Sequence, residues 1–243
     1  MADSRGRPSA VARVSDVPPT TSLEDPGYRA AVVDLCGVLG YAELAAFTHM
    51  AADSRMAPTA ELTGRLAQCA VLEYAHYEAV RGRLEAVGAS PEEAMAPFRT
   101  AVDAFHARTR PSTWLEALVK AYVGNGIASD FYAEIGRFVD SDTASVIADA
   151  RADAATADFV VEEVRRALHA DRRAAGRLAL FGRRIAGEAI SQGQQVAADR
   201  DALAALVVGE VGVGGADLAE IGEMSKRLTD RHSDRMARLG LEP

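Results

Sequence analysis

Five side chains able to bind a metal ion interrupt the apolar patterns of the sequence: Glu43, Glu73, His76, Asp130 and Asp153. Glu43 and Glu73 each stand in a stripe of apolar residues spaced three or four apart, which places them in the middle of an apolar helix face. Glu73 and His76 are one helical turn apart and share that face. A lone buried carboxylate is costly, so such a group is usually paired, neutralised or bound to metal.

The other two acids lie in later helical segments. Asp130 and Glu134 flank an apolar stripe beside Gly126, and Asp153 lies within the apolar stripe of residues 146–168. Four long helices therefore each offer a carboxylate near mid-length. Four-helix bundles use this arrangement for a dinuclear site, where carboxylates and imidazoles suit iron or manganese.

Each of these signals has a simpler interpretation. Glu73 and His76 could share a solvated face or form a satisfied core pair, and Glu43 could pair with an arginine. Asp153 would be solvated if its stripe were rotated by one position. The metal-site hypothesis depends on the coincidence across four helices.

Helix signals cover nearly all of the chain after Pro26. Capping residues occur at Asp25, at Ser90 and at Thr113, and no run alternates in the manner of strands. The four long helices are expected near 26–56, 58–88, 113–139 and 142–169. A short helix follows Ser90, a long one runs over 171–208, a Gly-rich loop spans 209–215, and a last helix follows. The predicted fold class is all-α, a bundle of long helices joined by short turns.

Composition narrows the class of protein further. The 243 residues are 49% hydrophobic and carry a net charge of −8, so the chain can bury a sizeable core and lacks a broad attraction to phosphate backbones or anionic lipid. We expect residues 1–24 to be a disordered tail and 25–240 to form one helical domain.

Two cysteines, no uninterrupted apolar span and no apolar leader predict a soluble, cytoplasmic protein with reduced thiols. Walker, dinucleotide and nucleophile-elbow motifs are missing, which disfavours nucleotide-dependent and hydrolase functions.

The sequence also resembles a known family. The blocks GYAELAAF, LEYAHYEAVRGRL, AMAPF and WLEALVKAYVGNGIASDFYAEI are similar, in order and spacing, to actinobacterial ferritin-like proteins grouped with the tRNA methylthio-isopentenyl-adenosine hydroxylases, the MiaE-like family. The resemblance covers roughly residues 28 to 210. It implies a ferritin-like four-helix bundle with additional C-terminal helices, a non-haem diiron centre, and O2-dependent hydroxylation of a modified adenosine in tRNA.

The resemblance also implies a set of iron ligands. Glu43 matches the first acid of the family pattern, Glu73 and His76 match Glu-x-x-His, Asp130 matches the third acid, and Asp153 matches the acid of the last motif. Three residues after Asp153, where histidine is expected, the chain has Thr156. A neutral hydroxyl is a poor iron ligand beside imidazole, so one iron position is expected to be weak or incomplete.

Two functions follow as hypotheses. The first is a non-haem diiron monooxygenase that would need a separate electron donor and, by resemblance only, would act on tRNA. The second is a non-catalytic helical bundle that serves in binding or assembly, with a degenerate metal site. No membrane partner is expected, and the chain is expected to be a monomer or a homodimer.

Overall fold

The computed structural model describes residues 21–149, 154–212 and 216–243, and every regular element in those ranges is helical. The α-helices are α1 (Pro26–Asp53), α2 (Ala60–Ala86), α3 (Pro91–Met95), α4 (Arg99–Arg108), α5 (Trp114–Ile135), α6 (Ser141–Asp149), α7 (Ala154–Ala170), α8 (Ala174–Asp199), α9 (Asp201–Val208) and α10 (Leu218–Leu239). The predicted all-α class is confirmed. The expected tail over 1–24 lies mostly outside the described residues.

The helices begin at the polar residues that the sequence marks as caps. The side chains of Asp25, Ser90 and Thr113 accept hydrogen bonds from the backbone N–H groups three residues further on. The second long helix starts at Ala60 rather than Pro58, because Thr59 provides its N-terminal cap. These local interactions set the starting points of the long helices that form the bundle.

Several predicted helices are divided. Residues 91–108 form α3 and α4 with a 3-10 turn at Ala96–Phe98 between them, and Pro97 in that turn lacks the backbone donor that a continuous helix requires. The expected helix over 171–208 breaks at Arg200, whose backbone is not helical and whose guanidinium pairs with buried Asp34 of α1. The helix expected over 142–169 appears as α6 and α7, and residues 150–153 between them lie outside the described part of the chain.

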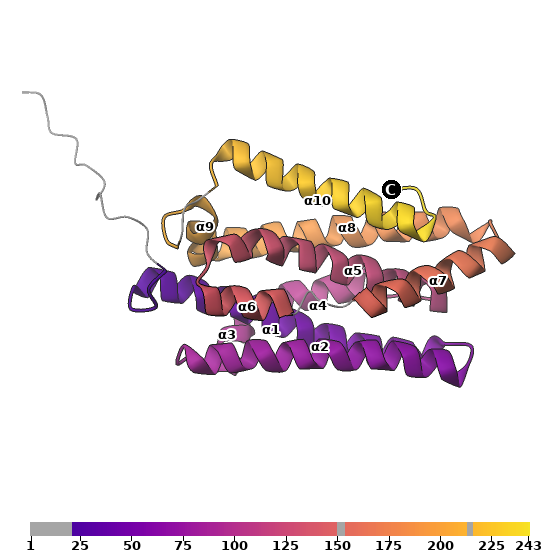
Figure 1. Cartoon of the computed structure of the whole chain (residues 1–243), viewed down its shortest axis with the longest axis horizontal. Coiled ribbons are helices and arrows are strands. Elements are labelled where there is room, and N and C mark those ends of the chain that lie inside the picture. Colours follow the sequence, from indigo (N-terminus) through magenta and orange to yellow (C-terminus); the bar gives the residue numbers. More distant parts are fainter. Residues whose placement is uncertain (1–20, 150–153, 213–215) are drawn as a thin grey trace, which may run out of the picture.

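The long helices run side by side (Figure 1). Helices α1 and α2 pack along one side, α5 lies against α8, and α10 packs along α5. The apolar core forms two clusters, one around Tyr28, Leu35 and Leu84 and the other around Leu66, Leu118 and Leu178. In each of α1, α2 and α5, residues near one end belong to the first cluster and residues near the other end belong to the second. A layer of polar residues therefore lies between the two clusters, at mid-length of these helices.

Helix α1 with the turn after it, Pro26–Met56, is long and apolar enough to cross a membrane by length and composition. It is the one such segment among the described residues, and 56% of its most apolar window is buried inside the bundle. Its apolar character follows from its position, because it packs against α2 on one side and contacts α3, α4 and α9 on others.

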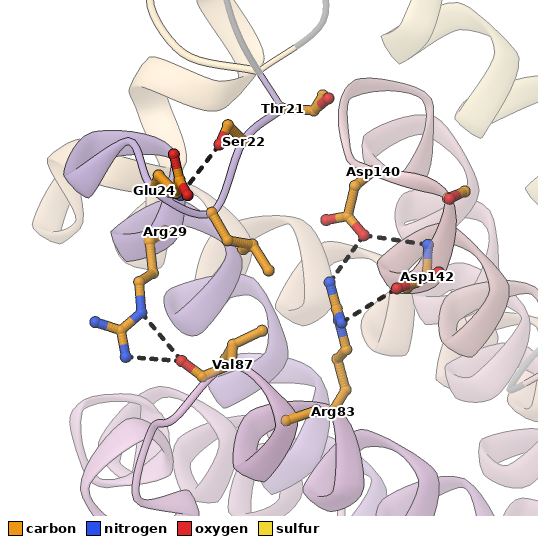
Figure 2. Close-up of a pocket in the computed structure, with 11 residues that line it drawn as sticks. Thr21, Ser22, Glu24, Arg29, Arg83, Val87, Asp140 and Asp142 are labelled. Atoms are coloured by element: carbon orange, nitrogen blue, oxygen red, sulfur yellow. Dashed lines mark hydrogen bonds and ion pairs between the residues drawn. The ribbon is translucent and has the colours of Figure 1, made fainter.

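A hollow of about 640 Å³ lies at one end of the bundle, where the segment before α1 meets the end of α2 and the start of α6 (Figure 2). Its charged groups serve the fold. Arg29 donates to the carbonyl oxygen of Val87 at the C-terminal end of α2, and Arg83 pairs with Asp140 at 2.8 Å. Asp140 in turn caps α6 through the backbone N–H of Thr143. These contacts join the ends of three elements.

Candidate metal centre

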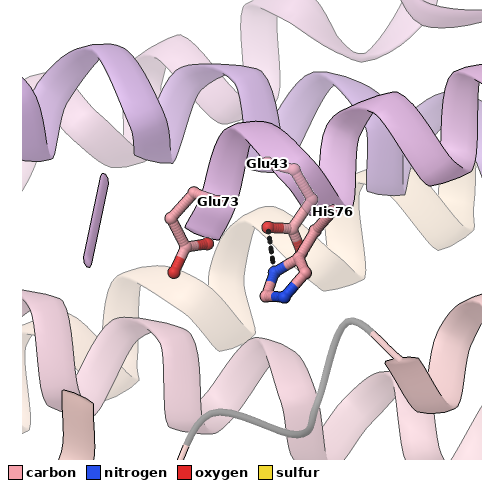
Figure 3. A group of neighbouring side chains, drawn as sticks. All are labelled: Glu43, Glu73 and His76. Carbon is pink, nitrogen blue, oxygen red and sulfur yellow. Dashed lines mark ion pairs between the residues drawn. The ribbon is translucent and has the colours of Figure 1, made fainter. Parts of the chain in front are cut away.

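Glu43, Glu73 and His76 come together in the polar layer between the two apolar clusters (Figure 3). One ligand atom from each lies within 4.8 Å of the others. Glu43 projects from α1, and Glu73 and His76 project from successive turns of α2, the helix most extensively packed against α1. Both glutamates are buried. The three side chains therefore form a compact donor set of two carboxylates and one imidazole.

The hydrogen bonding of this group is incomplete. His76 Nδ1 lies 3.6 Å from Glu43 Oε2, which is too long for a hydrogen bond, and the buried nitrogen has no hydrogen-bond partner among the described residues. Burial raises the pKa of Glu43 to about 7, against a smaller lowering effect of its hydrogen bond with Glu73. A cation between two buried carboxylates that are in contact stabilises the charged form of both.

The face of α5 opposite the glutamates is neutral. Asn125 donates a hydrogen bond from Nδ2 to Glu73 Oε1, which fixes the orientation of that carboxylate. Ser129 and Tyr132 lie one and two turns further along α5 and line the same cavity, which has a volume of about 240 Å³. Burial raises the pKa of Tyr132, and the nearby Glu43 and Glu73 raise it further, so the phenol stays protonated.

The structure does not bring Asp130 to the group of Glu43, Glu73 and His76. Its carboxylate instead receives a hydrogen bond from Arg235 Nη2 at 2.5 Å, and Arg231 lies 3.7 Å away. Glu134, the acid one turn further along α5, pairs with Arg227 at 2.8 Å. The reason is the register of α5, since both acids lie on the flank that packs against α10, where arginines neutralise them. Ligation of a metal by Asp130 is therefore not supported by its position.

The fourth predicted acid, Asp153, lies outside the described residues. The backbone of Thr156 lies in the first turn of α7, and Ala157, the next residue, lines the cavity. That turn of α7 thus faces the polar layer. The expected role of Asp153 and the expected weakness at Thr156 stay predictions.

Two residues of the site were missed by sequence reasoning, Asn125 and Arg235. Asn125 belongs to a second periodic stripe of α5 that continues through Ser129 and Tyr132, beside the apolar stripe that sequence analysis followed. Arg235 belongs to a row of arginines on α10, Arg227, Arg231 and Arg235, with the same four-residue spacing as Asp130 and Glu134. The matching spacing of the acidic row on α5 and the basic row on α10 was the signal that could have predicted their antiparallel pairing.

Gly126 explains how Arg235 reaches the cavity. A Cβ atom at Gly126 would overlap the guanidinium of Arg235, so the absence of a side chain lets that group lie directly against the backbone of α5. Arg235 and Arg238 both line the cavity that holds the two glutamates. A cationic residue therefore lies on the side of the cavity where the bundle pattern would place further acidic ligands.

The donor set fits one half of a dinuclear iron site. Ferritin-like dinuclear sites use a Glu from each of two helices and Glu-x-x-His from each of the other two. Glu43, Glu73 and His76 supply one of these halves, and the unpartnered Nδ1 of His76 is consistent with a missing ligand bond. Among the described residues, the opposite side supplies Asn125, Ser129, Tyr132 and Arg235, none of which is a ligand of choice for iron. One ion fits the described residues better than two.

Comparison with known proteins identifies the fold. A family model described as "Ferritin-like domain, actinomycetes" matches residues 26–210. Among solved structures, the chain is similar to a protein with aldehyde deformylating oxidase activity from Synechococcus, with a TM-score of 0.69 and 18% identity over 91% of this chain and 94% of that one. At this identity the similarity shows the fold alone. No curated protein gives a significant match.

Proposed function

The chain belongs to the actinomycete family of ferritin-like domains, and from this premise we propose that it is an O2-dependent iron oxidoreductase. The observation that carries the proposal is the buried group of Glu43, Glu73 and His76, whose ligand atoms lie within 4.8 Å of one another and whose imidazole Nδ1 has no hydrogen-bond partner among the described residues. Two carboxylates and one imidazole are suitable donors for iron.

The residues around the group have supporting roles. Iron bound there would supply the redox chemistry with O2, which protein side chains by themselves do not provide. Asn125 holds Glu73 through a hydrogen bond, and the apolar clusters on both sides limit the access of water. Since the cavity is small, about 240 Å³, it admits a small molecule or the end of a larger one.

The finer assignments rest on sequence resemblance. They are hydroxylation as the reaction, a modified adenosine of tRNA as the substrate, a dinuclear iron centre, and the cytoplasm as the compartment. The tRNA assignment can be tested by supplying the iron-loaded protein with a reductant and O2 and searching digested tRNA for a nucleoside that has gained one oxygen atom.

A second candidate function is a non-catalytic bundle with a degenerate metal site. The observation that favours it is the cationic and neutral lining opposite Glu43, namely Arg235 with Asn125. The two functions differ in iron binding, because only the first requires a bound ion.

Iron content distinguishes the two functions. We expect the wild type, reconstituted with Fe(II) under anaerobic conditions, to hold close to one ion per chain by elemental analysis. His76→Ala should weaken binding by more than about 100-fold because it removes the nitrogen donor. His169→Ala is the matched control, since His169 is exposed at the end of α7, and it should bind as the wild type does.

Thr156→His extends the same experiment to the second ion. Supplying the imidazole that the resemblance leads one to expect should raise the ratio above one. A folded wild type without iron would favour the non-catalytic function. Two tightly held ions in the wild type would contradict the one-ion interpretation.

A further inference from the structure

Arg235 is a buried cation whose hydrogen bonding is only partly satisfied. Its side chain is 11% exposed, and Nη2 donates to Asp130. Nη1 is buried and has no hydrogen-bond partner among the described residues. A buried N–H group of a charged guanidinium is expected to have an acceptor, because leaving it unpaired forfeits its hydration without compensation.

The position of this group connects it with the metal-binding residues. Arg235 lines the same cavity as Glu43, Glu73 and His76. Its guanidinium lies against Gly126 of α5, on the side of the cavity opposite these three residues. Arg238 lines the same cavity, but it is 55% exposed and pairs with Asp158 at 3.2 Å. Within the described lining, Arg235 is therefore the arginine that combines burial with an unused donor.

The unpaired N–H group of Arg235 favours an anionic ligand. The carboxylate that pairs with Arg235 is shared, because Arg231 lies 3.7 Å from the other oxygen of Asp130. On the other side of the cavity, a divalent ion would offset the charges of Glu43 and Glu73. The charge of Arg235 is then only partly offset, and a carboxylate is a planar anion that guanidinium groups bind well.

From these observations we infer that the cavity binds the carboxylate group of a small ligand between Arg235 and the metal-binding residues. Asp130 acts as a positioning residue, because its hydrogen bond to Nη2 holds the guanidinium at the cavity. Gly126 provides the space in which the guanidinium lies. The inference rests on the proposed function and names the class of substrate, a small carboxylic acid or a longer molecule that ends in a carboxylate.

The test uses the full chain loaded with Zn²⁺, a redox-inactive ion accepted by carboxylate and imidazole ligands. Acetate, butyrate and hexanoate are titrated calorimetrically, each beside the amide of the same chain length. The expected result is carboxylate binding at least about 10-fold tighter than amide binding, because the amide lacks the charge that Arg235 pairs with.

The principal variant is Asp130→Asn/Arg235→Met, which removes the ion pair without leaving either charge unpaired in the interior. It should weaken carboxylate binding at least about 10-fold while zinc content and thermal stability stay near those of the wild type. Arg238→Gln is the matched control and should leave binding within about twofold, because Arg238 already pairs with Asp158 in solvent.

Two results would overturn the inference: equal binding of acids and amides, or carboxylate affinity unchanged in Asp130→Asn/Arg235→Met. Zinc content measured on the same samples separates this failure from that of the proposed function. Carboxylate binding that depends on Arg235 in a protein unable to hold zinc would support the anion site and contradict the metal site.

Discussion

At the scale of single residues, the candidate centre depends on which neutral and charged groups face one another. Glu43 and Glu73 are two buried carboxylates in contact, an arrangement that proteins stabilise with a shared proton, a cation or strong donors. Burial raises the pKa of Glu43 to about 7, and its hydrogen bond with Glu73 opposes this effect only in part. Asn125 supplies the third, since it donates directly to Glu73.

The Asn125 hydrogen bond leads to a prediction about metal affinity. Asn125→Leu keeps the approximate volume of the side chain but removes the donor, so Glu73 is no longer held in one orientation. Metal affinity should fall roughly 10- to 100-fold, the range typical of residues that orient a ligand. A competition titration with a chelating dye measures this change.

Asn125→Asp is measured beside Asn125→Leu, because it replaces the amide donor with a carboxylate oxygen that can itself bind a metal ion. An affinity of Asn125→Leu equal to that of the wild type would show that the hydrogen bond to Glu73 does not support metal binding.

At the scale of elements, the contact between α5 and α10 decides where the acids of α5 point. Glu134 is buried, with its side chain 5% exposed, and it is held by Arg227, Arg231 and Arg137. The hydrogen bond and charge of Arg227, together with those of the other arginines, keep the pKa of Glu134 below its usual range despite burial. The last helix is thus attached to the bundle by ion pairs as well as by apolar residues such as Met236 and Leu239.

Glu134→Gln tests this attachment. The amide removes the charge while nearly preserving shape, and it should lower the free energy of unfolding by roughly 1–2 kcal/mol, because the partner arginines are partly exposed and regain hydration. Urea denaturation followed by circular dichroism measures the change. Glu223→Gln, on the exposed face of α10, is the control and should be neutral. Equal stabilities of the two variants would mean that the ion pairs do not hold α10.

At the scale of the whole molecule, the bundle buries a second group of titratable residues away from the candidate metal centre. His106 of α4 stacks on His49 of α1, with ring centroids 4.1 Å apart, and Lys120 of α5 lies nearby. Burial, with further contributions from Lys120 and His49, lowers the pKa of His106 to about 2. Protonation of His106 is therefore disfavoured in the folded chain.

This lowered pKa predicts acid sensitivity. The unfolded chain binds a proton at His106 below the ordinary histidine pKa of 6.5 and the folded chain does not, so stability falls as pH decreases below that value. In His106→Leu this contribution is lost. The stability of the variant relative to the wild type should therefore increase by up to about 1.4 kcal/mol for each pH unit below about 6.

Denaturation of both proteins at about pH 7, 6 and 5 measures the difference, and the comparison cancels the opposing contribution of Glu43, whose pKa is raised. A pH-independent difference would show that His106 titrates normally in the folded state.

Local sequence signals determined the helices of this protein and half of its candidate site. Caps such as Ser90 and Thr113 act within one turn, and Glu73 and His76 share a face by helical geometry alone, so both could be predicted without the fold. The division of helices at Pro97 and Arg200 was missed. The first arises from a missing backbone donor and the second from a partner, Asp34, that is 166 residues away.

Only the tertiary structure decided the other half of the site. Helix α5 contacts α7, α8 and α10 and is apolar on most of its N-terminal half, so its sequence pattern does not specify which face meets Glu73. Packing against α10 turned Asp130 toward Arg235 and placed Asn125 at the glutamates. The acid positions follow from periodicity, but the choice between binding a metal and pairing with an arginine depends on which side chain of another helix lies within a few ångströms.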